Sequence, residues 1–164
     1  QDVPLGKFKD KGVPIDNISK YNANQEEIIF ANVKSALAGK TLIFATRYAM
    51  VKLVETSEFE TANKLVAATK LGEGDQLIEI REMAYETDIV FETHDGYFLR
   101  CSLSDIPLQK KNSKGVIGIK LGKCDTLEHF YLLGTEPVEI TYRKKPLSLS
   151  RLKLAGRAGK GTKH

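Results

Sequence analysis

The stretch Asp88–Asp125 decides the fold and reads DIVFETHDGYFLRCSLSDIPLQKKNSKGVIGIKLGKCD. The apolar run Ile89–Phe91 has the length of a buried strand. A turn follows at His94-Asp95-Gly96, because glycine tolerates a positive φ, and residues 97–101 run back as a second strand. Residues 115–121 alternate as a third strand before another turn. The pattern predicts an antiparallel hairpin extended by further strands.

This pattern recurs along the chain. Thr41–Thr46 matches Asp88–Thr93 at an offset of 47 residues, and Lys70–Asp75 matches Lys120–Asp125 at an offset of 50. A fourth, weaker copy closes the chain, where Arg157-Ala158-Gly159-Lys160-Gly161 follows the pattern of residues 111–115. Four short strands in each repeat of roughly 50 residues are typical of a propeller blade. An ordinary meandering β-sandwich is the alternative.

The first copy starts in mid-repeat. Asp2-Val3-Pro4-Leu5 matches Asp105-Ile106-Pro107-Leu108 at an offset of 103, and the chain also stops in mid-repeat. We therefore expect residues 1–164 to form a single repeat domain, and the mid-repeat start suggests an excerpt of a longer protein. The predicted fold is all-β: a partial propeller of about three blades with about four strands each.

Composition excludes several classes of protein. The 164 residues are 41% hydrophobic, and no run approaches the roughly 18 apolar residues of a membrane-spanning helix. The two cysteines form no CxxC pair and there are only three histidines, so we expect no metal and no cofactor. The net charge is +4, yet residues 143–164 hold eight Lys or Arg and no acid. Such an asymmetry indicates a polyanion partner, and a solvated, frayed tail is the alternative.

The repeats resemble the blades of the C-terminal domain of bacterial type II topoisomerase A subunits, found in DNA gyrase and topoisomerase IV. The shared pattern runs from the apolar strand and its turn to Ser-(Asp/Glu), Lys-Gly-Val and Leu-Gly-x-x-Asp, and it covers nearly the whole chain. The resemblance implies a β-pinwheel, a propeller variant in which neighbouring repeats exchange strands. It also implies a non-catalytic domain that wraps duplex DNA without reading its sequence. The choice between gyrase and topoisomerase IV stays open.

Basic loops are the candidate DNA contacts. Residues 109–115, Gln-Lys-Lys-Asn-Ser-Lys-Gly, resemble the Gln-Arg-Arg-Gly-Gly-Lys-Gly box that marks DNA gyrase in this family, with Asn and Ser in place of the two glycines. Residues 155–161 are a second partial match, and a plain glycine-rich turn is its alternative. Lysine and arginine on a curved edge would neutralise phosphates without reading bases. The predicted contacts are Lys110, Lys111, Lys114, Arg157, Lys160, Arg47, Lys52, Arg100, Arg143, Lys144 and Lys145.

No catalytic set is readable in the sequence. Convincingly spaced Ser/His/Asp or Cys/His groups are missing, and Asp75 and Asp125 recur as turn formers and not as a metal pair. The family's catalysis is ATP-dependent and lies in regions outside this chain. The resemblance implies two partners besides DNA, namely the B subunit and the remainder of the topoisomerase polypeptide. It also implies a bacterial cytoplasmic, nucleoid-associated location without membrane contact.

Two other interpretations stay open: a propeller that binds proteins, and an enzyme on a propeller scaffold. Open blade edges would favour dimerisation.

Overall fold

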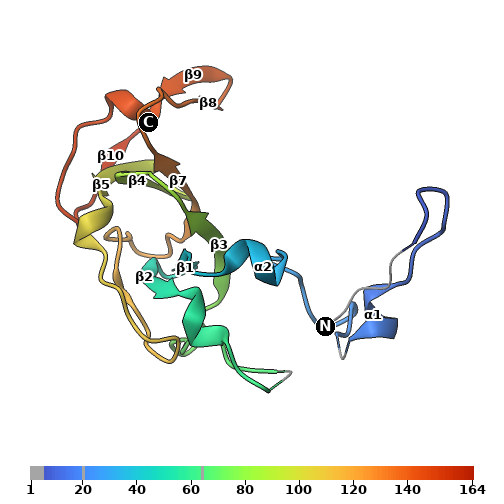
Figure 1. The fold of residues 1–164 in the computed structure, drawn as a ribbon. Helices are drawn as coiled ribbons and strands as arrows, with labels where there is room; N and C mark the ends of the chain where they lie inside the picture. Colours follow the sequence, from blue (N-terminus) through green and yellow to red (C-terminus); the bar gives the residue numbers. More distant parts are fainter. Residues whose placement is uncertain (1–5, 20, 64) are drawn as a thin grey trace.

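A computed structural model describes residues 6–19, 21–63 and 65–164. These residues form antiparallel sheets with little helix. Two four-stranded sheets and one two-stranded hairpin follow one another through the molecule (Figure 1). The all-β, propeller-like prediction is confirmed. The third unit contributes only a hairpin among the described residues, where four strands were expected.

The first blade has the strand order β3-β1-β2-β6. Its strands are β1 (Thr41–Thr46), β2 (Met50–Glu55), β3 (Leu77–Met83) and β6 (Val116–Ile117). The second blade repeats this arrangement in the order β7-β4-β5-β10. Its strands are β4 (Asp88–Thr93), β5 (Tyr97–Ser102), β7 (Leu127–Leu133) and β10 (Thr162–Lys163). The third unit pairs β8 (Glu139–Tyr142) with β9 (Lys145–Ser148).

Short helical turns connect these strands. The 3-10 turns η1 (Thr56–Phe59), η2 (Leu103–Asp105) and η3 (Leu149–Arg151) each follow the second strand of a unit. The two α-helices, α1 (Ile15–Ile18) and α2 (Lys34–Leu37), precede the first blade. The part of the segment that carries α1 extends away from the blades, whereas α2 lies beside the first blade (Figure 1).

Neighbouring repeats exchange their edge strands. β6 follows β5 in the chain but pairs with β2 of the preceding blade, and β10 pairs in the same way with β5. The predicted third strand over 115–121 is therefore wrong in length and in place, because it shortens to β6 and joins another sheet. β6 ends at Ile117, directly before Gly118, whose backbone lies so close to the Phe91 ring that a Cβ would approach it to 2.7 Å.

The blades pack face to face through one apolar core. Ile43 and Val51 of the first blade meet Ile89 and Phe91 of the second, and all four side chains are at most 1% exposed. β3 and β7 lie next to each other at one edge, where the Phe130 amide donates to the Glu79 carboxylate at 3.2 Å. β6 and β10 consequently lie at the opposite edge of their sheets.

The first repeat copy falls partly outside the described residues, because residues 1–5 are among those left out. No β-strand occurs in the described part of residues 6–40. Gly12 has a φ of 71°, close to that of its counterpart Gly115 at 89°, yet no atom lies within 4 Å of the position of a Cβ. Further along, Phe30 and Leu37 pack against the free face of the first blade.

Candidate nucleic-acid interface

Strand exchange places two basic loops on equivalent edges of neighbouring blades. The first rim loop, residues 109–115, begins where the Gln109 amide donates to the Leu53 carbonyl at 2.8 Å. The second rim loop, residues 155–161, begins where the Ala155 amide donates to the Arg100 carbonyl at 2.9 Å. Both loops then lead into the exchanged strands β6 and β10. Segments 46 residues apart in sequence thus occupy the same position on successive blades.

Each rim loop ends on a glycine that the sheet requires. Gly115 has a φ of 89°, and a Cβ there would lie 2.6 Å from the Val51 carbonyl oxygen. Gly161 has a φ of 75°, and its Cβ would lie 2.5 Å from the Phe98 carbonyl oxygen. Other residues are strained in such a left-handed conformation, and here they would also collide with backbone. The last glycine of the box-like sequence therefore seats the loop against the blade.

The third position of each loop anchors it to the preceding 3-10 turn. The Lys111 Nζ donates to the Glu58 carbonyl oxygen. In the next blade the Arg157 Nε donates to the Asp105 carbonyl at 3.1 Å, and its guanidinium also donates to the Ile117 carbonyl at 2.6 Å. Both side chains hold the loop while remaining partly exposed. They are predicted phosphate contacts that also have a structural role.

Other basic side chains of the loops project outward. Lys110, Lys114 and Lys160 are exposed, and the Lys160 Nζ lies 5.2 Å from the centre of the Tyr97 ring. Lys163, which was not among the contacts predicted from sequence, lies 5.4 Å from the same ring. Its sequence signal was only its place in the basic C-terminal segment. A tyrosine with two ammonium groups near its face forms a small basic patch at the edge of the second blade.

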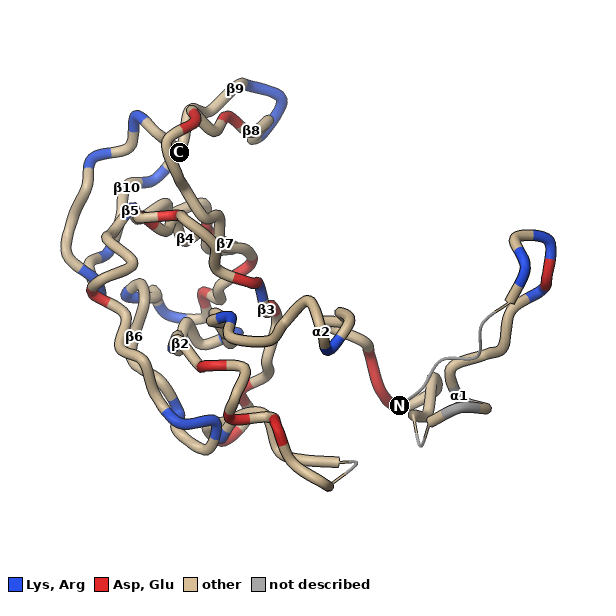
Figure 2. Tube along the Cα trace, in the orientation of Figure 1, with Lys and Arg blue, Asp and Glu red and all other residues tan. Residues whose placement is uncertain are grey.

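The β8–β9 turn presents three more basic residues. Arg143 and Lys144 have φ values of 49° and 64°, so the two-residue turn is left-handed at both positions. Such turns favour Asn-Gly, and each non-glycine residue here costs about 1–2 kcal/mol. The Arg143 guanidinium lies 5.1 Å from the Tyr142 ring, and Lys145 is exposed at the start of β9. Figure 2 shows Lys and Arg at this turn, along the C-terminal segment and at the foot of the first blade.

Lys52 does not belong to this exposed set. Its side chain is 1% exposed, and its Nζ donates to the carbonyls of Lys111 at 2.6 Å and Ser113 at 2.9 Å, with a longer bond to Lys110 at 3.5 Å. Burial lowers the pKa of Lys52 to about 8, against the opposing influence of the Glu58 carboxylate. The structure thus corrects the predicted role: Lys52 supports the first rim loop from below and does not reach a phosphate.

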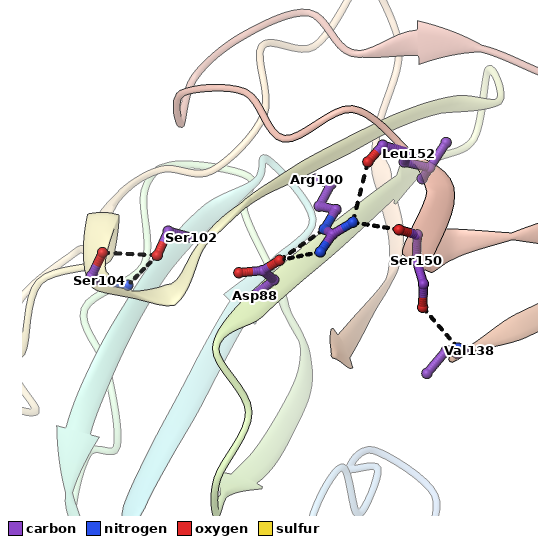
Figure 3. Close-up of polar contacts among 7 residues, drawn as sticks. All are labelled: Asp88, Arg100, Ser102, Ser104, Val138, Ser150 and Leu152. Atoms are coloured by element: carbon purple, nitrogen blue, oxygen red, sulfur yellow. Dashed lines mark hydrogen bonds and ion pairs between the residues drawn. The ribbon is translucent and has the colours of Figure 1, made fainter. Parts of the chain in front are cut away.

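Arg100 is also an internal support (Figure 3). Its guanidinium lies 2.6 Å from the Asp88 carboxylate and donates to the carbonyls of Ser150 and Leu152. The side chain is 24% exposed, and Asp88 only 13%. Arg100 consequently ties the second blade to η3, and most of its donors are engaged inside the molecule. These internal bonds give Arg100 a structural role, and its predicted contact with DNA stays a prediction.

Arg47 is exposed in the turn between β1 and β2. It lines a hollow together with His94 and Cys124, separate from the hollow beside the first rim loop. The prediction that Arg47 contacts DNA stays a prediction.

The recurring aspartates form turns, as expected. The Asp75 carboxylate accepts the Tyr48 amide at 2.9 Å, and the Asp125 carboxylate accepts the Asp95 amide at 3.0 Å. Each aspartate therefore clamps the first hairpin turn of its blade. Within the described residues, no cluster of three or more His, Cys, Asp or Glu could hold a metal ion. Over the same part of the chain, no helix is long and apolar enough to span a membrane.

Comparison with known proteins gives consistent matches. Residues 87–133 match the family model described as the DNA gyrase C-terminal domain, beta-propeller. The A subunit of DNA gyrase from Streptococcus pyogenes serotype M3 is 38% identical over 58% of the chain and 12% of its own length. The A subunit of DNA topoisomerase 4 from Streptococcus pneumoniae serotype 4 is 26% identical over 94% of the chain and 20% of its own length. The chain thus spans a fifth or less of these relatives.

Solved structures share the fold. The crystal structure of the C-terminal domain of DNA topoisomerase IV superposes with a TM-score of 0.80 at 23% identity, covering 95% of the chain and 50% of that structure. The structure of a DNA gyrase A C-terminal domain gives 0.74 at 19% identity, covering 94% of the chain and 53% of that structure.

Proposed function

Because this chain belongs to the family of C-terminal domains of bacterial type II topoisomerase A subunits, we propose that it binds and bends duplex DNA on its basic edge, without catalysis of its own. One observation carries the proposal: strand exchange sets the two rim loops on the same edge of successive blades. Exposed lysines at corresponding positions of the two loops, Lys114 and Lys160, suit a phosphate backbone that curves past them. The described residues offer no recognition helix, so we expect weak sequence preference.

The structure refines which residues we propose as contacts. Exposed side chains at the rim loops and the β8–β9 turn make the first group: Lys110, Lys114, Lys160, Lys163, Arg143, Lys144 and Lys145. Lys111 and Arg157 combine contact with anchoring, and Arg47 is a peripheral candidate. Lys52 acts through the first rim loop, which it supports, and Arg100 ties the second blade to Ser150 and Leu152.

The wider setting is part of the same proposal. We expect the domain to act within an ATP-dependent topoisomerase, joined to the catalytic part of the same polypeptide and assembled with a B subunit, in the bacterial cytoplasm near the nucleoid. Dimerisation through open blade edges stays a prediction. The edge of β9 is a poor place for dimerisation. Pro146 of β9 corresponds to Leu53 of β2, whose amide donates to the Pro107 carbonyl in the first blade, but proline has no amide proton to donate.

Titration of fluorescent duplex DNA at several salt concentrations tests the proposal. If about five or six phosphates are neutralised, the log–log slope of affinity against salt is near −5. Replacing Lys160 and Lys163 by Ala should reduce that slope by about two and weaken binding to all sequences alike. The matched control replaces Lys7 and Lys9, two exposed lysines of the N-terminal segment, and should change binding much less. A parent slope near zero, or tight binding to one sequence only, contradicts the proposal and favours a protein-binding propeller.

A further inference from the structure

Each rim loop has an acidic residue beside it, but only the acid beside the first rim loop pairs with a lysine of that loop. Glu58 of η1 and Asp105 of η2 occupy equivalent positions, 47 residues apart. The Glu58 carboxylate lies 2.8 Å from the Lys110 Nζ and also accepts the Lys111 amide at 3.4 Å. In the second rim loop the counterpart of Lys110 is Gly156, which has no side chain to offer. Across the described residues, the Asp105 carboxylate takes part in no ion pair.

The first rim loop has stronger anchors than the 3.4 Å bond from the Lys111 amide to the Glu58 carboxylate. Lys52 fixes the loop from inside through three backbone carbonyls. The Lys111 side chain bonds to the backbone carbonyl of Glu58 and not to its carboxylate. Neutralising the carboxylate therefore removes the partner of Lys110 and leaves the main anchors of the loop in place.

Resting on the DNA binding proposed above, we propose that the Glu58 carboxylate competes with DNA phosphates for Lys110, so that the first rim loop binds duplex DNA more weakly than the second. The Lys110 side chain is 85% exposed and Glu58 only 21%, so the acid lies beneath the lysine. A phosphate must displace the carboxylate from Lys110 and approach a second negative charge. The bond from Lys110 holds the pKa of Glu58 below its usual value, so the acid stays charged at neutral pH.

Two matched variants of the whole chain test this inference in the same salt-dependent titration. Glu58→Gln removes the charge that pairs with Lys110. Asp105→Asn removes an equal charge at the equivalent position of the next blade, where there is no such pair. At low salt we expect E58Q to bind duplex DNA up to about fivefold more tightly, which corresponds to an exposed ion pair, with a slope steeper by about one. D105N should show less than half of that gain.

A third comparison isolates the lysine. In a chain that already carries Lys110→Gln, E58Q and D105N should change the affinity for DNA by the same amount, because the lysine for which Glu58 and the phosphate compete is absent. Equal gains for E58Q and D105N in the parent, or weaker binding by E58Q, overturn the inference while DNA binding itself stands. No binding by the parent or by any variant overturns both proposals. The parent and E58Q should have the same melting curve. If their curves differ, the comparison in the Lys110→Gln background still tests whether the gain in affinity depends on Lys110.

Discussion

Replacing Gly161 by Ala should loosen the edge of the second blade. An L-residue at a φ of 75° costs about 1–2 kcal/mol, and the new Cβ would lie 2.5 Å from the Phe98 carbonyl oxygen, which forces β10 outward. β10 pairs with β5 over only two residues, Thr162 and Lys163, so displacement loses one or two hydrogen bonds of about 1 kcal/mol each. The sum is about 3 kcal/mol, which lowers the melting temperature by about 6–12 °C for a chain of this size.

Thermal and urea unfolding measure this loss, and Gly156→Ala is the matched control in the same loop. Gly156 has no positive φ, and no atom lies within 4 Å of its Cβ position, so G156A should melt within about a degree or two of the parent. G161A should also weaken duplex DNA binding, because Lys160 and Lys163 leave their places beside Tyr97. If G161A melts like G156A, β10 is not seated against β5 as described, and the closing glycine does not position the second rim loop.

Lys52→Met should destabilise the chain by roughly 1–3 kcal/mol, because the partly buried Lys111 carbonyl loses its donor and the carbonyls of Lys110 and Ser113 each lose one of theirs. The pKa of Lys52 is about 8 in the folded chain and 10.5 in the unfolded chain, so the unfolded state binds more protons between pH 8 and pH 10.5. Urea unfolding should therefore show that the parent gains stability over K52M as the pH rises through this range. A difference in stability that does not change with pH would contradict this expectation. Arg100→Leu should cost about 2–4 kcal/mol in the same assay by stranding the Asp88 carboxylate, whereas R100L with D88L should recover part of the loss; equal stability of parent and R100L would refute the support role. Iodoacetamide at about pH 8 should modify exposed Cys124 and spare buried Cys101, whose pKa burial raises to about 12, as peptide mass spectrometry would show; fast labelling of Cys101 would contradict its burial.

The hairpins and the repeat were predictable because their signals are local. An apolar run, a turn with a residue that tolerates positive φ and a returning apolar run predict β4 and β5 without any distant contact. The rim loops were predictable for the same reason, since their basic residues and closing glycines recur at a fixed spacing. The repeat, its hairpins and its basic loops therefore follow from sequence, whereas the pairing of β6 with the preceding blade does not follow from local signals.

The roles of Lys52 and Arg100 were not predictable from sequence. Strand alternation assigns each side chain to a face of its sheet but does not say what covers that face. The carbonyls that surround Lys52 come from a loop about 60 residues further along, and those that bind Arg100 come from about 50 residues further along. A basic residue beside buried strands was taken as a DNA contact, whereas long-range packing made it an internal hydrogen-bond donor.

The exchange of edge strands also determines how the chain can be cut. A truncation after Leu133 would keep all of β4, β5 and β7 but remove β10, and with it the outer edge of the second blade. Removal of residues 105–117 would in turn strip β6 from the first blade while leaving β1, β2 and β3 intact. Between β1 and β10, no cut in the chain separates one whole blade from the next, so unfolding should spread from one blade to the next as a single cooperative event. A shortened chain would keep the first blade whole only if it ended after β6, and the second blade whole only if it ended after β10.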